Sequence, residues 1–355
     1  MRAVSPPITF WPAALCVAIA FVGGFVFNHF HLPLAFMLGA IAATMIVALA
    51  GVQIARPHRH VVTPMRASLG VLLGSAITPD LLDRIGALGA AAAFVPVFVL
   101  ISTIVGTIYY RRLAGFPRDE AFFCAVPGGL HMMTIYAEEA GVDIRRVALA
   151  HALRITFVVL MAPLAVSFLT TMPVINVINA SVSITELPMR DFMLLLAAGV
   201  VGWAIGRRTG MPGGQMIGPM LASAALHISG ITAAKPPVEI IILSQVIIGA
   251  SIGARYVGET LTIVGQAIVL AFGYVVITLA IATAFAGTLH LIFDLPVITG
   301  MLSFSPGGMS EIGLIALALG LDVGFVATIQ VSRSLTIAFF APVAYRRIEQ
   351  FLKDE

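Results

Sequence analysis

Long apolar runs dominate the chain, and short polar stretches separate them. In the first half these runs cover residues 11–30, 33–51, 65–80, 86–110 and 144–170, and the second half repeats the order. Most reach the roughly 18 residues that a helix needs to cross the ~30 Å hydrocarbon core of a bilayer. Because no polar stretch is long enough for a soluble domain, the pattern predicts an all-α polytopic membrane protein.

Composition supports this prediction. The chain is 59% hydrophobic and 10% charged, and its mean hydropathy is +1.03, whereas soluble proteins carry about 25% charged residues. We expect the first run to be an uncleaved span, since no small-residue cleavage pattern follows it. Cys16 and Cys124 both lie in apolar runs, which disfavours a disulfide framework or a thiolate metal site. The net charge of +3 is scattered along the chain, so nothing indicates a nucleic-acid partner.

The two halves are related by an internal repeat. Residues 127–163 align without a gap to 306–342, at an offset of 179, and eleven of the 37 positions are identical. The same offset relates Pro33 to Pro212 and Gly39 to Gly218. We therefore predict a first membrane repeat at 1–170, a linker at 171–190 and a second membrane repeat at 191–355. Duplicated halves of this kind often place a binding site at their interface.

Each repeat contains a Pro-Gly-Gly break, and the topology depends on whether this segment crosses the membrane. If it crosses, the halves are parallel, with twelve Lys and Arg on one side and six on the other. If it dips in and returns, each half has about five spans, the second half is inverted, and the count becomes fifteen inside against three outside. The positive-inside rule favours two inverted repeats, each with a re-entrant Pro-Gly-Gly segment. A discontinuous helix that crosses remains the alternative.

These motifs resemble those of the AbrB family of bacterial inner-membrane proteins, which is distinct from the soluble DNA-binding regulator of that name. The resemblance rests on Pro33–Gly39 and Pro127–Gly129 in the first half, and on Pro212–Gly218 and Pro306–Ile312 in the second. It extends over nearly the whole chain. The first half departs from the pattern at His131–Met132, where the second half has Ser310–Glu311. The family's functions vary among regulator, ammonia monooxygenase and transporter, so the resemblance leaves the activity open.

Two arginines occupy equivalent positions inside the last helix of each half. Arg154 lies about ten residues into its helix, which places it ~15 Å deep at 1.5 Å per residue, and Arg333 is its repeat mate. A charge at that depth needs a partner. One hypothesis is that the guanidinium groups bind an anionic substrate. The alternative is that each arginine ties down carbonyls freed at its own hairpin tip, or pairs with Glu311.

The Pro-Gly-Gly tips are the other candidate site. Open backbone at membrane depth is tolerated where protein or a water-filled cavity covers it, and helix N-termini after the breaks would favour an anion. The tips comprise Pro127, Gly128, Gly129, Pro306, Gly307 and Gly308. Glu311 is a candidate cation ligand or proton carrier, or else a salt-bridge or first-turn helix carboxylate. Ser310 adds a hydroxyl and His131 a titratable ring, which is equally well explained by simple hydrogen bonding.

Three functions fit these residues. The first is a secondary transporter, ion-coupled or facilitative, that moves a small organic anion or metabolite, with proton or sodium as the coupling ion, in the bacterial inner membrane. The second is a membrane-embedded regulator of gene expression that acts through a ligand or partner. The third, a metal-dependent oxidase, is disfavoured because the histidine pairs at 29/31 and 58/60 have no further ligand nearby. We expect no enzymatic activity, no cofactor or metal, and a homodimer in the bilayer.

Overall fold

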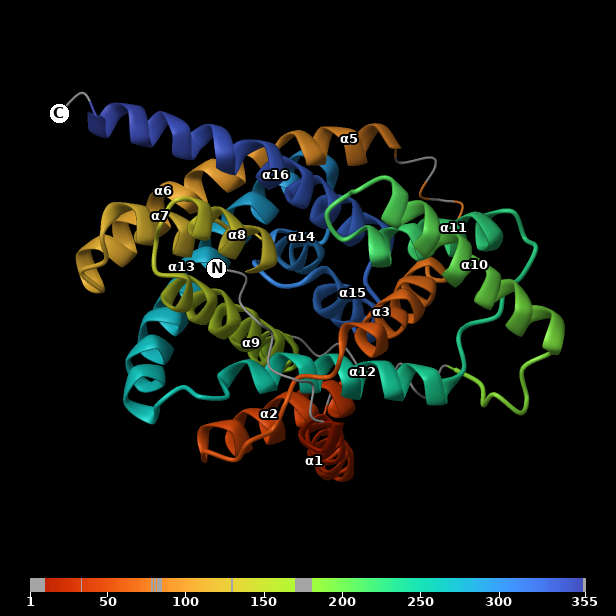
Figure 1. The fold of residues 1–355 in the computed structure, drawn as a ribbon. Coiled ribbons are helices and arrows are strands. Elements are labelled where there is room, and N and C mark those ends of the chain that lie inside the picture. Colours follow the sequence, from red (N-terminus) through yellow and green to blue (C-terminus); the bar gives the residue numbers. More distant parts are fainter. Residues whose placement is uncertain are drawn as a thin grey trace.

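The computed structural model describes residues 10–32, 34–77, 79, 81, 85–128, 130–169 and 181–353, and the described residues form helices and connecting turns without a strand (Figure 1). The helices of the first half are α1 Phe10–His29, α2 Ala35–Leu49, α3 Arg59–Gly74, α5 Ile85–Ala93, α6 Val95–Leu113, α7 Arg118–Ala125, α8 Leu130–Glu139 and α9 Ile144–Leu169. Those of the second half are α10 Met189–Arg208, α11 Gly214–Ile228, α12 Val238–Gly253, α13 Leu261–Phe293, α14 Val297–Phe304, α15 Met309–Ala318 and α16 Val323–Lys353, with a short 3-10 turn, η1 Ala254–Tyr256, after α12.

Six stretches within the described residues are long and apolar enough to cross a membrane, and they lie in α1, α5–α6, α10, α12, α13 and α16. The prediction of an all-α polytopic membrane protein is confirmed. Helices α2 and α11 have 15 residues each and α3 has 16, so they fall short of a full crossing length. Helix α9 has 26 residues but contains three arginines. A charge at membrane depth must be covered by protein, so this helix cannot face lipid along its whole length.

The order of helices repeats along the chain. Helices α1, α2 and α3 correspond to α10, α11 and α12, the pair α5–α6 corresponds to α13, and α9 corresponds to α16. Each Pro-Gly-Gly break separates two short helices, α7 from α8 and α14 from α15. Residues 171–180 of the predicted linker lie outside the described residues, so the division of the chain at 171–190 stays a prediction.

The helices form two bundles that mix both halves. Helices α1, α2, α3, α10, α11 and α12 pack together as the glycine-packed bundle, in which α2 contacts α12 and α11 contacts α3. Here Gly23 lies directly against Gly39, and Gly206 lies directly against Gly214. Since lipid offers no hydrophobic drive for helix association, close backbone approach at small residues supplies the packing. Figure 1 shows this bundle at the bottom and right of the view.

Helices α5–α9 and α13–α16 form the second group, the hairpin bundle, at the top and left of Figure 1. Within it the equivalent helices α6 and α13 pack side by side. The rings of Phe98 and Phe285 are 5.5 Å apart, and those of Tyr109 and Tyr274 are 6.1 Å apart. As residue numbers rise along α6 they fall along α13, so these two equivalent helices run antiparallel.

Buried apolar side chains join the two bundles. One core cluster takes residues from α2, α3, α11 and α12 and packs them against α9, α15 and α16; it includes Leu38, Leu72, Met216, Ile315 and Val326. A second cluster fills the hairpin bundle around Phe98, Phe123, Tyr274 and Phe304. The first cluster places the second Pro-Gly-Gly segment at the boundary between the bundles.

Candidate functional site

The first Pro-Gly-Gly segment is a hairpin that turns back on itself. Arg146, at the start of α9, donates a hydrogen bond from Nη1 to Glu120 Oε2 in α7 at 2.9 Å. Further along the two helices Phe123 contacts His151, so α7 runs alongside α9 in the same direction. After the break, α8 ends at Glu139, five residues before α9 begins at Ile144. Both ends of the hairpin therefore lie at the N-terminal end of α9.

The second segment has the same shape. Gln330 Nε2 of α16 donates to Ser303 O of α14 at 3.0 Å, and the contacts of Arg333 lie two and four residues further along the hairpin. Helix α14 therefore runs parallel to α16. Helix α15 ends at Ala318, and α16 begins at Val323. This hairpin thus begins and ends at the N-terminal end of α16.

A buried arginine holds the tip of the first hairpin. Arg154 donates from Nη1 to Val126 O at 3.0 Å and from Nη2 to Gly128 O at 2.9 Å, on either side of Pro127. Its Nη2 also lies 2.9 Å from His151 Nδ1. Since a guanidinium can only donate, His151 Nδ1 accepts, and its Nε2 carries the proton that bonds Phe123 O at 2.8 Å. The guanidinium, the imidazole ring and the three carbonyl groups form one connected network.

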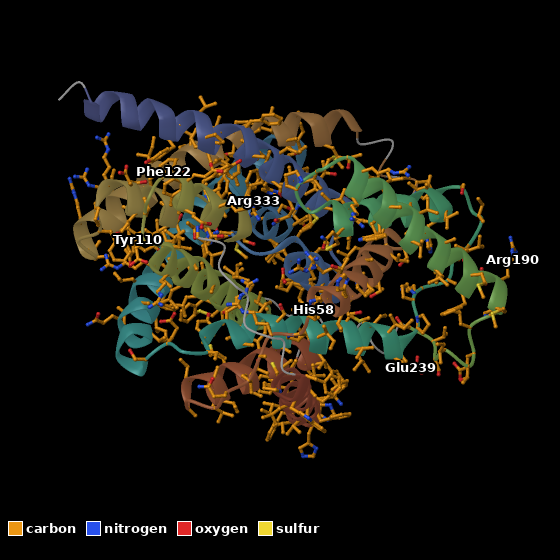
Figure 2. The ribbon with its side chains drawn as sticks, viewed as in Figure 1. His58, Tyr110, Phe122, Arg190, Glu239 and Arg333 are labelled. Carbon is orange, nitrogen blue, oxygen red and sulfur yellow. The ribbon has the colours of Figure 1, made fainter. Side chains whose placement is uncertain are left out.

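The second hairpin repeats the contacts of the arginine, whereas Gln330 Nε2 bonds Ser303 O, one residue beyond the repeat equivalent of Phe123. Arg333 donates from Nη1 to Ser305 O, and from Nη2 to Gly307 O at 2.8 Å and to Gln330 Oε1 at 2.5 Å. Every partner is displaced by 179 residues from its counterpart, and Gln330 takes the place of His151. Figure 2 shows Arg333 in the interior of the molecule, whereas Arg190 lies at its edge.

These bonds give both arginines a structural task. The proline and glycines interrupt the helix, and this leaves carbonyl groups without intrahelical partners. A hydrogen bond from a charged donor contributes about 1.5–3 kcal/mol, and an unsatisfied buried carbonyl costs a comparable amount. Arg154 is 2% exposed and Arg333 is 5% exposed. Their Nη atoms bond the hairpin backbones and the side chains of His151 or Gln330, whereas the buried Nε of Arg154 makes no hydrogen bond within the described residues.

The two tips pack against each other's final helix in a reciprocal way. A carbon added at Gly128 would lie 3.0 Å from Ile337 Cγ2 of α16, and one added at Gly307 would lie 3.4 Å from Val158 Cγ1 of α9. Val158 and Ile337 are themselves 179 residues apart. The charges of Arg154 and Arg333 also act on each other. Each hairpin tip therefore packs against the last helix of the other half, at positions one repeat apart.

Glu311 lies in the first turn of α15, and its carboxylate folds back over the break. A carbon added at Gly308 would collide with Glu311 Oε2, so this glycine leaves room for the acid. Glu311 is 7% exposed, as is Ser310. In the part of the chain that the structure describes, Glu311 makes no ion pair with Arg333.

Arg255 is the arginine that interacts electrostatically with Glu311. It lies in η1, directly after α12, and it also feels the charges of Arg56 and Arg66. Its Nη1 atom is buried and makes no hydrogen bond within the described residues. Arg255 is thus the cation whose charge acts on Glu311, and it retains an unused donor.

Comparison with known proteins shows the family to which the chain belongs. Residues 36–349 match the family model described as "Transition state regulatory protein AbrB". The chain belongs to the AbrB family. It is 27% identical over 348 residues to "Putative regulator AbrB" of Escherichia coli (strain K12), covering 97% of this chain and 98% of the relative. It is 23% identical over 350 residues to "Uncharacterized protein YhjN" of Bacillus subtilis (strain 168), covering 93% and 91%.

In this AbrB-family chain the structure brings most of the predicted site residues together at the two tips. These are Pro127, Gly128 and Arg154 in the first half and Pro306, Gly307, Gly308, Ser310, Glu311 and Arg333 in the second. Gly129 lies outside the described residues. His131 belongs to α8, but its side chain is outside the described part. No three His, Cys, Asp or Glu side chains that are described lie close enough to hold a metal ion.

Sequence reasoning missed His151, Gln330 and Arg255. The first two are a repeat pair at the offset of 179, three residues before each buried arginine, and that spacing puts them on the arginine's face of the helix. The repeat could have found them. Arg255 ends the third span of the second half, and no equivalent position in the first half draws attention to it. Only the fold brings this residue to Glu311.

Proposed function

We propose that this AbrB-family protein is a secondary transporter of a small organic anion or metabolite in the bacterial inner membrane, either ion-coupled or facilitative. Access alternates around a site at the two Pro-Gly-Gly tips. The observation that carries the proposal is the reciprocal packing of the tips, each held open by its own buried arginine, at the boundary between two bundles. Such interrupted segments at the interface of duplicated halves are typical of transporter binding sites.

The proposal takes the repeats as inverted in the membrane. The antiparallel packing of the equivalent helices α6 and α13 supports this, because a two-fold axis that reverses a spanning helix lies in the membrane plane. The distribution of Lys and Arg supports it independently. The first hairpin then enters from the cytoplasmic side and the second from the opposite side, so that their tips meet near the midplane.

The class of substrate follows from the hydrogen-bond donors that are not already bonded to the protein. The Nη atoms of Arg154 and Arg333 hold carbonyl groups, so these residues attract an anion by charge but are not its bidentate clamp. Arg255 keeps a buried Nη1 donor beside Glu311, and the N-terminus of α15 adds positive potential. We assign substrate binding to the α15 end of the tips, with Glu311 as the residue that takes up the coupling proton or sodium ion.

Alternating access would come from movement of the hairpin bundle against the glycine-packed bundle. The contact between them is the large apolar cluster that includes Leu72 and Ile315, and no ion pair among the described residues joins the two bundles. The glycine-to-glycine contacts within the other bundle favour a rigid unit. Dimeric elevator-type carriers share this division into a fixed and a moving bundle, and the comparison is an analogy of fold.

The test is substrate-dependent flux through purified protein in proteoliposomes. A panel of small carboxylates and phosphates is applied under proton, sodium or no gradient, and charge movement and uptake are recorded. We expect flux for at least one compound, and we expect Glu311→Gln to reduce it about 100-fold or more while the protein elutes as a folded species. The exposed acid Glu186 provides the matched control, Glu186→Gln. No flux across the panel, or equal flux in both variants, would refute the proposal.

Regulation through a partner is the second candidate, because the E. coli relative is named a regulator. The described loops between helices are short, so regulation would act through a bound partner at residues 56–66 and 111–120, which include the loops before α3 and between α6 and α7. Site-specific photocrosslinking at these loops in cells distinguishes the two functions. A specific protein adduct in the absence of any flux would favour the regulator.

A further inference from the structure

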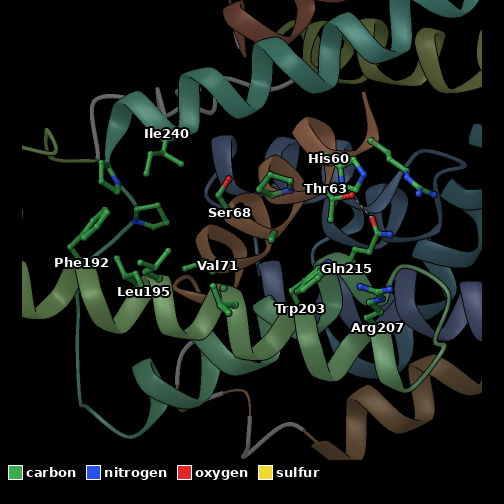
Figure 3. A pocket seen from close by; sticks show the side chains of 18 residues that line it. His60, Thr63, Ser68, Val71, Phe192, Leu195, Trp203, Arg207, Gln215 and Ile240 are labelled. Atoms are coloured by element: carbon green, nitrogen blue, oxygen red, sulfur yellow. Dashed lines mark hydrogen bonds between the residues drawn. The ribbon is translucent and has the colours of Figure 1, made fainter. Parts of the chain in front are cut away.

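A cavity of about 670 Å³ lies within the glycine-packed bundle, between α3, α10 and the start of α12. None of the hairpin-tip residues lines it, so it is separate from the proposed transport site. Its volume falls in the range of about 300–1,000 Å³ that is usual for small-molecule sites. The side chains that line it form an elongated shape with two chemically different ends (Figure 3).

One end is cationic and polar. His60, Thr63, Arg207 and Gln215 gather there (Figure 3). Arg59, which directly precedes His60 in α3, also lines the cavity. Thr63 Oγ1 donates to Gln215 Oε1 at 3.4 Å. Among the described residues neither Arg59 nor Arg207 forms an ion pair, so no acidic side chain of the bundle neutralises this end.

The opposite end is apolar. Phe192, Leu195 and Ile240 line it together with Pro236 and Pro237. Helix α10 advances 15 residues from Phe192 to Arg207 (207 − 192), which corresponds to ~22 Å at 1.5 Å per residue. One leaflet of a bilayer with a ~30 Å hydrocarbon core is ~15 Å deep. The cavity is therefore long enough to receive an acyl chain while its cationic end stays at the membrane surface.

We propose that this cavity binds an anionic phospholipid. The phosphate lies between Arg59 and Arg207, and an acyl chain runs past Trp203 and Gly199 toward Phe192. The positive-inside rule places the cationic end in the cytoplasmic leaflet, where basic pockets between helices bind anionic headgroups. A second copy of the chain fits less well, because interface centres are depleted in charged residues. The proposal does not depend on transport activity.

The chain provides its own probe, because it contains two tryptophans, Trp11 and Trp203. In a Trp11→Phe background, fluorescence reports on Trp203, which lines the cavity. The protein is reconstituted into nanodiscs with lipids brominated on the acyl chains, either phosphatidylglycerol or phosphatidylcholine at equal bromine content. We expect phosphatidylglycerol to quench Trp203 about twofold more strongly, because its chain is held beside the indole ring.

Charge variants test the headgroup. Removal of each arginine should weaken phosphatidylglycerol binding about fivefold, so Arg59→Gln with Arg207→Gln should weaken it about 25-fold and abolish the quenching preference. The matched control is Arg208→Gln, since Arg208 is the exposed neighbour of Arg207 and does not line the cavity. Equal quenching by both lipids, or the same loss in the control, overturns the proposal.

A second pair of variants tests the chain-binding part. A carbon added at Gly199 would make only ordinary contact, 3.6 Å from Val71 Cγ2, so Gly199→Leu places its side chain in the cavity without a backbone clash. We expect it to remove the quenching preference, while Ala197→Leu, on the exposed face of α10, preserves it. If Trp203 is shielded from both lipids in proportion to dimer formation, a second copy fills the cavity and the proposal fails.

Discussion

The two hairpins of the molecule are built alike at their breaks and differently beside them. In both, a buried arginine donates to the carbonyl groups on either side of the proline. These belong to Val126 and Gly128 in the first hairpin and to Ser305 and Gly307 in the second, 179 residues later. Beside the second break Glu311 covers the backbone, and Met132 stands at the equivalent position in the first. The duplicated features keep a hairpin open, whereas the unduplicated acid is the feature available for a specialised task.

The duplicated network solves an electrostatic problem as well as a steric one. Two guanidinium groups act on each other across the tips, and like charges in a medium of low dielectric repel strongly. Each group is surrounded by carbonyl oxygens and by the acceptor atom of His151 or Gln330. These oriented dipoles stabilise the charge locally, so neither arginine requires a carboxylate partner.

The largest expected loss of stability comes from removal of one of the two buried arginines at the hairpin tips. Arg154→Gln or Arg333→Gln leaves two buried carbonyl groups without their charged donor, and each unsatisfied buried group costs about 1–3 kcal/mol, so the pair costs about 2–6 kcal/mol. We expect each variant to lose this much stability and to unfold at a markedly lower temperature in detergent. Fluorescence-detected size exclusion after heating measures the shift.

Two comparisons sharpen this prediction. Arg208→Gln, at an exposed site, should leave the midpoint temperature of thermal unfolding unchanged. Arg154→Lys and Arg333→Lys should be intermediate, because an ammonium group cannot reach two carbonyl groups with the geometry of a guanidinium. A large loss at one arginine with none at the other would show that the two hairpins do not share a structural task.

Gly308 offers a smaller and more local test. In Gly308→Ala the added carbon would collide with Glu311 Oε2, and we expect a loss of about 1–3 kcal/mol from the forced displacement. Gly265→Ala is the control, since no atom lies within 4 Å of the added carbon. Thermal unfolding measures both variants.

The collision predicts a specific coupling. If Glu311 is the obstacle, Glu311→Ala should relieve most of the cost of Gly308→Ala, so the double variant is more stable than the sum of the single effects predicts. Additive effects would mean that the carboxylate does not cover the break, and the asymmetry between the hairpins would lose its structural basis.

Much of the fold was predictable because it follows from hydropathy and the repeat. The spans, the two breaks and the buried arginines all appear in the sequence pattern, and the hypothesis that the arginines tie down carbonyl groups names the contacts that Arg154 and Arg333 make. The inverted arrangement in the membrane and the linker boundaries stay predictions. What could not be predicted depends on packing between distant helices. Arg255 reaches Glu311 only through the fold, and the cavity near Trp203 exists only because α10 lies beside α3.

His151 and Gln330 allow the finest test of the comparison, because each is the natural replacement for the other. Both accept a hydrogen bond from the Nη2 atom of the arginine and donate to a carbonyl of the hairpin. His151→Gln should therefore cost less than about 1 kcal/mol, whereas His151→Ala removes both bonds and should cost about 1–3 kcal/mol. The reciprocal change Gln330→His should be equally mild if the two networks are equivalent, and thermal unfolding of the three variants measures the differences. If the glutamine destabilises as strongly as the alanine, the imidazole has a role that the amide cannot supply, and the first hairpin would then be specialised as well.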